Sequence, residues 1–194
     1  SDLILLSLIA FIVALIFLKP VTLIWSIPAL FIFLTYPFFK RFFPIPQAYL
    51  GLAFSFGIPM AFIEASGELS LATFILFFAN FLWVLAYDTI YALVDIDDDL
   101  KIGIKTSAIT FGSLVIEVIM GCYIVFILLL LVLGVICRFH WVYYVGVGLE
   151  IYLIKKVYQQ IKAKERQACF KAFLFNNNIG LSLFVVIILN YLLG

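Results

Sequence analysis

Long apolar stretches alternate with short polar connections along almost the whole chain. At about 1.5 Å of rise per residue, a helix of roughly 20 apolar residues crosses the hydrocarbon core of a bilayer. Seven predominantly apolar runs approach this length, at residues 3–18, 21–39, 47–63, 69–87, 107–136, 141–154 and 172–193. The pattern predicts an all-α fold, a polytopic transmembrane helical bundle. The first and sixth runs are short for a span, so the ends of their helices are expected to extend into the loops or beyond Ser1.

The basic residues are distributed unevenly between the two sets of loops that these helices create. One set holds Lys40, Arg41, Lys101, Lys105, Lys155, Lys156, Lys162, Lys164, Arg166 and Lys171. The opposite set holds only Lys19 and Arg138. Because Lys and Arg accumulate in cytoplasmic loops, the first set is expected in the cytoplasm and the second outside.

Composition supports the assignment to a membrane. Hydrophobic residues make up 66% of the chain, charged residues 12%, and the mean hydropathy is +1.25, values that are not those of a soluble domain of this length. The formal net charge of +1 provides no basic field for nucleic acid. Membrane lipid is the expected surrounding, and the three cysteines show no spacing typical of a zinc site.

The densest group of charges follows the fourth apolar run, where five aspartates lie between residues 88 and 99. An α-helix turns about 100° per residue, so the steps from Asp88 to Asp95 and on to Asp99 return to nearly the same direction. These three carboxylates are therefore expected on one helix face, flanked by Tyr91. The other two acids of the stretch point elsewhere.

Carboxylates stacked in this way repel one another unless cations or protons neutralise them. Oxygen donors without His or Cys suit Mg²⁺, which is commonly shared with substrate phosphates. A calcium loop does not fit, because counting from Asp95 places Leu100 where glycine is required and Thr106 where glutamate is required. The other interpretation is a solvated acidic loop that Lys101 and Lys105 balance.

Two further stretches combine polar groups with apolar surroundings. Lys40 and Arg41 lie among aromatic residues between positions 36 and 47. They could anchor the chain at the lipid headgroups, or form an anion site that faces the acidic helix. In the last apolar run, residues 176–178 are three consecutive asparagines, whose amides are expected to face a polar interior or one another.

Residues 88–106, DTIYALVDIDDDLKIGIKT, closely resemble the second aspartate-rich motif of the UbiA superfamily of intramembrane prenyltransferases, and of its bacterial 4-hydroxybenzoate polyprenyltransferases in particular. Other segments resemble that family in the same order: Tyr36-Pro37-Phe38 with Lys40-Arg41, Pro46-Gln47, Gly51, Ile58-Pro59-Met60-Ala61-Phe62, and Cys169-Phe170-Lys171-Ala172-Phe173 with Asn176-Asn177. The resemblance covers essentially the whole chain.

The resemblance implies a nine-helix intramembrane bundle that depends on Mg²⁺. It would transfer a polyprenyl group from polyprenyl diphosphate to the ring of 4-hydroxybenzoate, in ubiquinone biosynthesis, with the active site facing the cytoplasm of a bacterial inner membrane. By position in the motif, Asp88, Asp95 and Asp99 are the implied catalytic and metal-binding carboxylates. The implied substrate-binding residues are Tyr91, with Lys101 and Lys105 toward the diphosphate, and Lys40 and Arg41 toward the benzoate.

One departure from the family concerns its first aspartate-rich motif, of the type NDxxDxxxD, which this sequence does not contain. Residues 1–194 are therefore expected to form one N-terminally incomplete prenyltransferase domain with about seven of the nine helices. A catalytically incomplete fragment is one alternative. A cation- or proton-coupled transporter is another; it predicts an acid near the bilayer midplane, whereas the acids noted here gather at the cytoplasmic edge.

Overall fold

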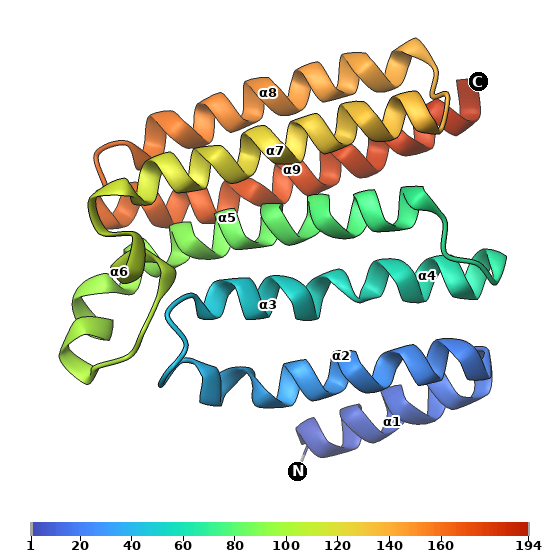
Figure 1. Cartoon of the computed structure of the whole chain (residues 1–194), viewed down its shortest axis with the longest axis horizontal. Coiled ribbons are helices and arrows are strands. Elements are labelled where there is room, and N and C mark those ends of the chain that lie inside the picture. Colours follow the sequence, from blue (N-terminus) through green and yellow to red (C-terminus); the bar gives the residue numbers. More distant parts are fainter. Residues whose placement is uncertain (1, 194) are drawn as a thin grey trace.

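The computed structural model describes residues 2–193, and it describes side chains from Leu5 onward. The order of elements is α1 (Asp2–Phe17), α2 (Pro20–Phe39), α3 (Pro46–Ser55), α4 (Gly57–Ser66), α5 (Leu71–Ile102), α6 (Ser107–Phe111), the 3₁₀ helix η1 (Gly112–Leu114), α7 (Val115–Ile136), α8 (Trp141–Ile161) and α9 (Arg166–Leu193). No strand occurs within residues 2–193. The predicted all-α architecture is confirmed (Figure 1).

The helix bounds differ from the predicted runs where a break divides a run and where a helix continues through polar residues. The run predicted at 47–63 is divided at Phe56 into α3 and α4, and the run predicted at 107–136 begins with α6 and η1. The run predicted at 69–87 extends as α5 to Ile102. Hydropathy loses its signal at charged turns although the backbone hydrogen bonds continue through them.

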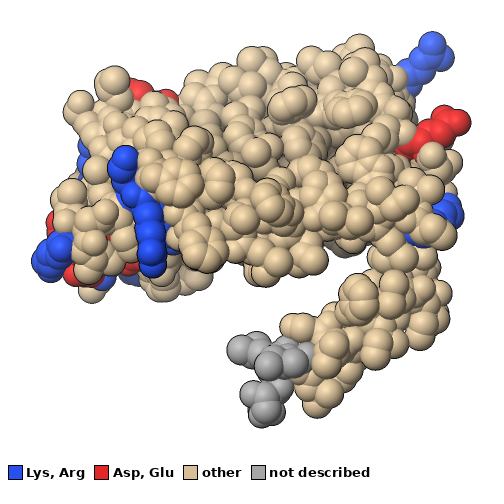
Figure 2. Space-filling view, turned by 60° about the horizontal axis from the view of Figure 1, so that its bottom comes forward, with Lys and Arg blue, Asp and Glu red and all other residues tan. Residues whose placement is uncertain are grey.

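Five segments are long and apolar enough to cross a membrane, and together they make this an integral membrane protein: Pro20–Phe39, Pro46–Ser66, Leu71–Ile102, Ser107–Ile136 and Arg166–Leu193. Helix α1 has 16 residues, fewer than the roughly 20 that a span requires. Figure 2 shows charged side chains at the two ends of the molecule, with uncharged residues between them on the face in view. That distribution is expected of a bundle whose middle lies in hydrocarbon.

Helix α5 lies at the centre of the bundle and packs against α3, α7 and α9. Helix α8 covers α7 and α9 on one side, and α2 packs on α3 and α4 on the other (Figure 1). Helix α1 projects from this bundle (Figure 2), with its described side chains almost all exposed. The central position of α5 means that several other helices surround the residues along its length.

At the end opposite the acidic stretch, Glu64 joins the first hairpin to α4. Its carboxylate accepts hydrogen bonds from the Thr22 hydroxyl at 2.7 Å and from the Lys19 backbone amide at 2.9 Å. The Lys19 ammonium group also donates to the Glu64 carbonyl. Glu64 therefore connects α4 to the start of α2 rather than simply facing solvent.

Candidate active site

The acidic stretch is part of α5 and not a loop. Ser70 and Thr73 form a capping box at the start of this helix, and Gly103, with a φ of 71°, ends it by donating its backbone N–H to the Asp99 carbonyl. At 32 residues the helix measures about 48 Å, against roughly 30 Å of hydrocarbon. Its last turns, which carry the aspartates, therefore extend beyond the apolar core of a membrane.

The exposure of the aspartates agrees with the predicted helix face. Asp88, Asp95 and Asp99 are half-buried, whereas Asp97 and Asp98 are exposed. The first three thus turn toward the rest of the bundle and the other two toward solvent. The helical geometry expected from the sequence is confirmed for all five residues.

The end of α2 brings a cation to this face of α5. Lys40 is half-buried and lies within electrostatic range of both Asp88 and Asp99. Its ammonium nitrogen is also 5.2 Å from the centre of the Tyr36 ring, a cation–π distance. Arg41 differs, because it is exposed and no ion pair joins it to a carboxylate within residues 2–193.

Tyr91 and the two lysines after the acids have distinct surroundings. The Tyr91 side chain is 37% exposed and within hydrogen-bonding reach of Asp95. Lys101 pairs with the exposed Asp98, with 3.2 Å between Nζ and Oδ1. Lys105 donates through its side chain to the Phe42 carbonyl at 3.0 Å, so in this structure it ties the loop after α5 to the loop after α2.

Hydrogen bonds between these two loops fix the position of α2 relative to α5. The Lys105 backbone amide donates to the Lys40 carbonyl at 3.0 Å, and the Ser107 amide donates to the Gln47 side-chain oxygen at 2.8 Å. The Ser107 hydroxyl lies 2.8 Å from that of Thr89 on α5. Because Gln47, Thr89 and Ser107 are all buried, their hydrogen bonds form a polar network that joins the start of α6 to α3 and α5, next to the Lys105–Lys40 hydrogen bond.

Arg166, at the start of α9, also reaches the acids, and the sequence analysis did not single it out. Its guanidinium nitrogen lies 3.2 Å from Asp98 Oδ2 and 4.0 Å from Asp95 Oδ1. A cavity of about 480 Å³ lies beside it, lined by Val94, Arg166, Gln167, Phe170 and Lys171. No local signal marks Arg166, because 68 residues separate it from Asp98.

An apolar cavity of about 220 Å³ lies farther along α5 from the acids. Its lining consists of Ile58, Leu76, Ala79, Asn80, Trp83, Phe126, Leu130, Gly180, Leu183, Phe184 and Ile187. Rings connect it to the acidic face: Trp83 lies 5.4 Å from Tyr87, Tyr87 lies 6.0 Å from Phe173, and Phe173 lies 4.8 Å from Tyr91. Apart from Asn80 and Gly180, all the residues that line the cavity have aromatic or aliphatic side chains.

Of the three consecutive asparagines on α9, only Asn176 is buried. Its side-chain oxygen accepts hydrogen bonds from the Tyr123 hydroxyl at 2.6 Å and from the Trp83 indole at 3.3 Å. The prediction of an interior position is confirmed for Asn176 and wrong for Asn177 and Asn178, which are exposed. Consecutive helical residues point about 100° apart, so three in a row cannot share one face.

The carboxylate oxygens of the α5 face suit a hard cation. The three aspartates are too far apart along the helix axis for all of them to bind the same ion. Asp88 and Asp95 differ by about 10 Å in height along the helix, and Asp95 and Asp99 by about 6 Å. Within residues 2–193, no group of three or more His, Cys, Asp or Glu residues is close enough to hold a metal ion. These carboxylates therefore fit Mg²⁺ if each ion takes one or two of them as ligands. Substrate, water or other segments would supply the remaining donors.

A second buried acid, Glu150 in α8, also escaped the sequence analysis. Its side chain is fully buried, the Ser182 hydroxyl of α9 bonds to its Oε1 atom, and its Oε2 atom has no hydrogen-bond partner. Glu150 lies near the middle of α8 (Trp141–Ile161), away from the acids that gather at the end of α5. This carboxyl lines neither of the two cavities described above, and it belongs to no group of three or more potential metal ligands in the described chain.

Comparison with known proteins agrees with the architecture. A solved UbiA homolog from Aeropyrum pernix K1, in its apo form, superposes with a TM-score of 0.77 over 90% of this chain and 66% of its own, at 23% identity. Digeranylgeranylglyceryl phosphate synthase superposes with a TM-score of 0.71 over 90% of this chain and 63% of its own, at 17% identity. At these identities the likeness shows a shared fold.

Relatives with higher identity carry a single name. A 4-hydroxybenzoate octaprenyltransferase from Neisseria meningitidis serogroup B (strain ATCC BAA-335 / MC58) is 55% identical over 163 residues, which are 84% of this chain and 55% of the relative. Another, from Methylobacillus flagellatus, is 49% identical over 180 residues, which are 93% of this chain and 60% of the relative. The chain thus spans somewhat more than half the length of the curated relatives it matches.

Residues 3–179 match the family model described as "UbiA prenyltransferase family". The matched region includes α2, the acidic face of α5 and the start of α9. Most of the chain lies inside that match, and the helical fold agrees with it. The protein is a member of the UbiA prenyltransferase family.

Proposed function

We propose that the protein to which this chain belongs transfers a polyprenyl group from polyprenyl diphosphate to the aromatic ring of 4-hydroxybenzoate, in ubiquinone biosynthesis. One observation carries the proposal: Asp88, Asp95 and Asp99 lie on one half-buried face of α5, with Lys40 beside them and an apolar cavity farther along the helix. The names of the relatives, 4-hydroxybenzoate octaprenyltransferase, support the choice of substrates. Residues 1–194 belong to a single transmembrane domain in this proposal.

The acidic face would hold the diphosphate end of the substrate. Asp88, Asp95 and Asp99 would coordinate Mg²⁺, and the chemistry that Mg²⁺ supplies when bound is neutralisation of the diphosphate charge as it leaves. Lys101 lies close by on the same helix, where it forms an ion pair with the exposed Asp98. Lys105 would add a second positive charge from the adjoining loop, provided that it releases the Phe42 carbonyl.

The second substrate would approach from the end of α2. Lys40 lies over the acidic face, and the adjacent Arg41 has an exposed guanidinium that can grip a carboxylate at two points. The half-exposed Tyr91 stands between them and the aromatic rings of the cavity. In this arrangement the benzoate carboxylate stays near the cations while its ring faces the allylic carbon.

The apolar cavity would receive the first isoprene units of the prenyl chain. Trp83 and Phe126 stack with their ring centres 6.3 Å apart and form part of its wall. An allylic cation that forms beside such a wall is protected from water, which would otherwise quench it before the ring carbon attacks. The C–O bond to the diphosphate would break with its electron pair leaving on the diphosphate, the ring carbon would bond to the prenyl carbon, and the ring proton would pass to the released diphosphate or to water.

The site would face the cytoplasm of a bacterial inner membrane. The acidic end of α5, the basic end of α2 and the loop before α9 lie at one end of the bundle, and most Lys and Arg residues occupy that end. Because basic residues concentrate on the cytoplasmic side, this end is assigned to the cytoplasm.

The decisive experiment measures prenyl transfer from labelled polyprenyl diphosphate to 4-hydroxybenzoate in membranes with Mg²⁺. The chain of 194 residues is compared with a longer protein that also carries an NDxxDxxxD motif upstream. Asp95→Ala in the longer protein should abolish transfer, and Asp97→Ala, which removes an exposed carboxylate of the same stretch, should retain it. Activity only in the longer protein would identify the present chain as a catalytically incomplete part.

A transporter, the competing function, predicts movement of cations or protons and no prenyl transfer. If the longer protein transfers no prenyl group while membranes that contain it move cations or protons, the transferase proposal is wrong. Equal loss of transfer in Asp95→Ala and Asp97→Ala would also contradict the assignment of one catalytic face.

A further inference from the structure

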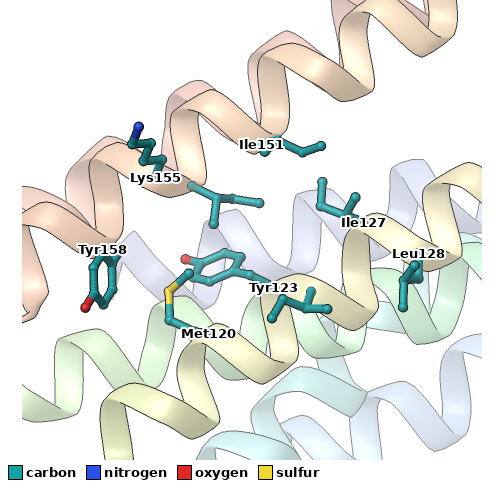
Figure 3. A pocket seen from close by; sticks show the side chains of 9 residues that line it. Met120, Tyr123, Ile127, Leu128, Ile151, Lys155 and Tyr158 are labelled. Atoms are coloured by element: carbon teal, nitrogen blue, oxygen red, sulfur yellow. The ribbon is translucent and has the colours of Figure 1, made fainter.

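A groove between α7 and α8 lies away from the acidic face of α5. It has a volume of about 380 Å³, within the range of roughly 300–1,000 Å³ that is typical of small-molecule sites. Figure 3 shows side chains of both helices pointing into it. Its lining consists of Met120, Tyr123, Ile124, Ile127, Leu128, Ile151, Ile154, Lys155 and Tyr158.

The groove opens outward and is closed toward the interior of the bundle. Ile124, Leu128 and Ile151 form its lips and are each more than half exposed, at 58%, 54% and 54%. Its floor includes Tyr123, which is fully buried and donates its hydroxyl hydrogen to Asn176 on α9. An occupant would therefore enter from the lipid side and would not reach the catalytic face.

The two ends of the groove differ in chemistry (Figure 3). Lys155 and Tyr158 lie at one end, in the last turns of α8, and aliphatic side chains such as Leu128 and Ile151 lie at the other. None of the lining side chains is acidic. This arrangement matches a molecule with an anionic head and a hydrocarbon tail.

The Lys155 ammonium is available for such a head. It is exposed, and no hydrogen bond or ion pair engages it within residues 2–193. The neighbouring Lys156 instead lies over the Tyr152 ring, with 4.6 Å between Nζ and the ring centre. Only the first of these two lysines lines the groove.

From these observations we infer that the α7–α8 groove is a binding site for an anionic phospholipid. One acyl chain lies along the aliphatic end, and the phosphate lies near Lys155 and the Tyr158 hydroxyl. An empty groove would leave the atoms of its lining without the van der Waals contacts that a bound acyl chain supplies. The bound lipid would complete the packing of α7 against α8.

The test uses native mass spectrometry of the detergent-purified protein with dioleoyl phosphatidylglycerol or dioleoyl phosphatidylcholine. Phosphatidylglycerol is expected to be retained at lower lipid concentrations. Lys155→Gln should weaken its retention about five-fold, which corresponds to roughly 1 kcal/mol for one basic residue near an anionic lipid. Lys156→Gln is the matched control and should leave retention unchanged.

A second pair of variants tests the acyl chain. Ile124→Trp places a larger side chain in the mouth of the groove and should remove the bound phosphatidylglycerol. Leu149→Trp, at an exposed position of α8 outside the groove, should not. Circular dichroism and a single chromatographic peak establish that each variant is folded.

Three outcomes would overturn the inference. Equal retention of phosphatidylglycerol and phosphatidylcholine would mean that the groove holds ordinary annular lipid. Equal effects of Lys155→Gln and Lys156→Gln would remove Lys155 from the site. Displacement of phosphatidylglycerol from the unaltered protein by equimolar polyprenyl diphosphate would assign the groove to a prenyl chain instead.

Discussion

Carboxylates occupy two regions of this bundle and meet different surroundings. At the end of α5, Asp88, Asp95 and Asp99 are half-buried, and the cations Lys40 and Arg166 approach them from α2 and α9. Between α8 and α9, Glu150 is fully buried, and none of the ion pairs among the described residues includes it. The first region places opposite charge close to its carboxylates, whereas the second holds its carboxyl among the packed side chains of α8 and α9.

The hydrogen bonds of Glu150 indicate how an acid without a cation is accommodated. The Ser182 hydroxyl has one hydrogen, yet both Glu150 Oε1 and the Ile179 carbonyl oxygen lie within hydrogen-bonding distance of it. A protonated Glu150 resolves this, because it can donate to the Ser182 oxygen while Ser182 donates to Ile179. Glu150 is then a neutral group that joins α8 to α9.

The difference shows that an acidic residue in a membrane bundle is not by itself a sign of ion chemistry. Burial of an isolated charge is expensive, so a carboxyl inside the bundle is neutral or paired. Carboxylates that remain charged lie at the rim, where cations and substrate phosphates can reach them. In this protein the rim is the end of α5.

The largest expected effect distinguishes the aligned carboxylates from their neighbours. In the longer protein, Asp88→Asn is expected to lower prenyl transfer by about 10²–10³-fold, because it removes a carboxylate that we propose as a ligand of Mg²⁺. Asp98→Asn should change it less than about three-fold, since Asp98 is exposed and points to another side. Steady-state rates with both substrates saturating measure the difference, and equal losses would contradict the comparison.

A charge introduced at the buried position of Glu150 should destabilise the fold. Glu150→Lys is expected to lower the free energy of unfolding by about 3–5 kcal/mol, because it leaves an uncompensated charge between α8 and α9. Glu150→Gln should cost about 1 kcal/mol or less, since an amide can keep the hydrogen bond to Ser182. Thermal unfolding in detergent compares the two, and a lysine variant as stable as the glutamine variant would show that water reaches this position.

A smaller effect on stability is expected at Gly146, which packs closely against Val186 of α9. A Cβ atom added to Gly146 would lie 2.3 Å from Val186, whereas one added to Gly148 would meet nothing within 4 Å. Gly146→Ala is therefore expected to destabilise the protein by about 1–3 kcal/mol through overpacking. Gly148→Ala is the matched control on the same helix and should be neutral or slightly stabilising. Similar unfolding temperatures for both variants would mean that α8 and α9 can move apart at little cost.

The smallest effect is expected from the exposed cations at the acidic end. Lys101→Gln and Arg166→Gln each remove an ion pair to Asp98 that solvent and salt screen strongly. Neither substitution should measurably change the unfolding temperature in 0.15 M salt. A clear drop for Arg166→Gln alone would show that its contact with Asp95 stabilises the junction of α5 and α9.

Much of this architecture could be predicted because hydropathy and helical period are local properties. The apolar runs predicted the helices, and the steps of seven and four residues predicted that Asp88, Asp95 and Asp99 share a face that the structure shows as half-buried. Their assignment as metal ligands stays a prediction. The helix bounds were less accurate, since charged turns at 88–102 continue a helix that a hydropathy pattern ends at residue 87.

Other features depended on how distant helices meet. Lys40 is held beside the end of α5 by the hydrogen bond from the Lys105 amide to its carbonyl, between residues far apart in the sequence. Glu150 is one apolar-flanked acid in the sequence, and only the contact with Ser182 on α9 shows what accommodates it. The sequence by itself determined the helices and the face that each carboxylate occupies, because these follow from the backbone period. The tertiary structure alone decided which carboxylates meet cations and which is sealed from water, because that depends on the neighbouring helices.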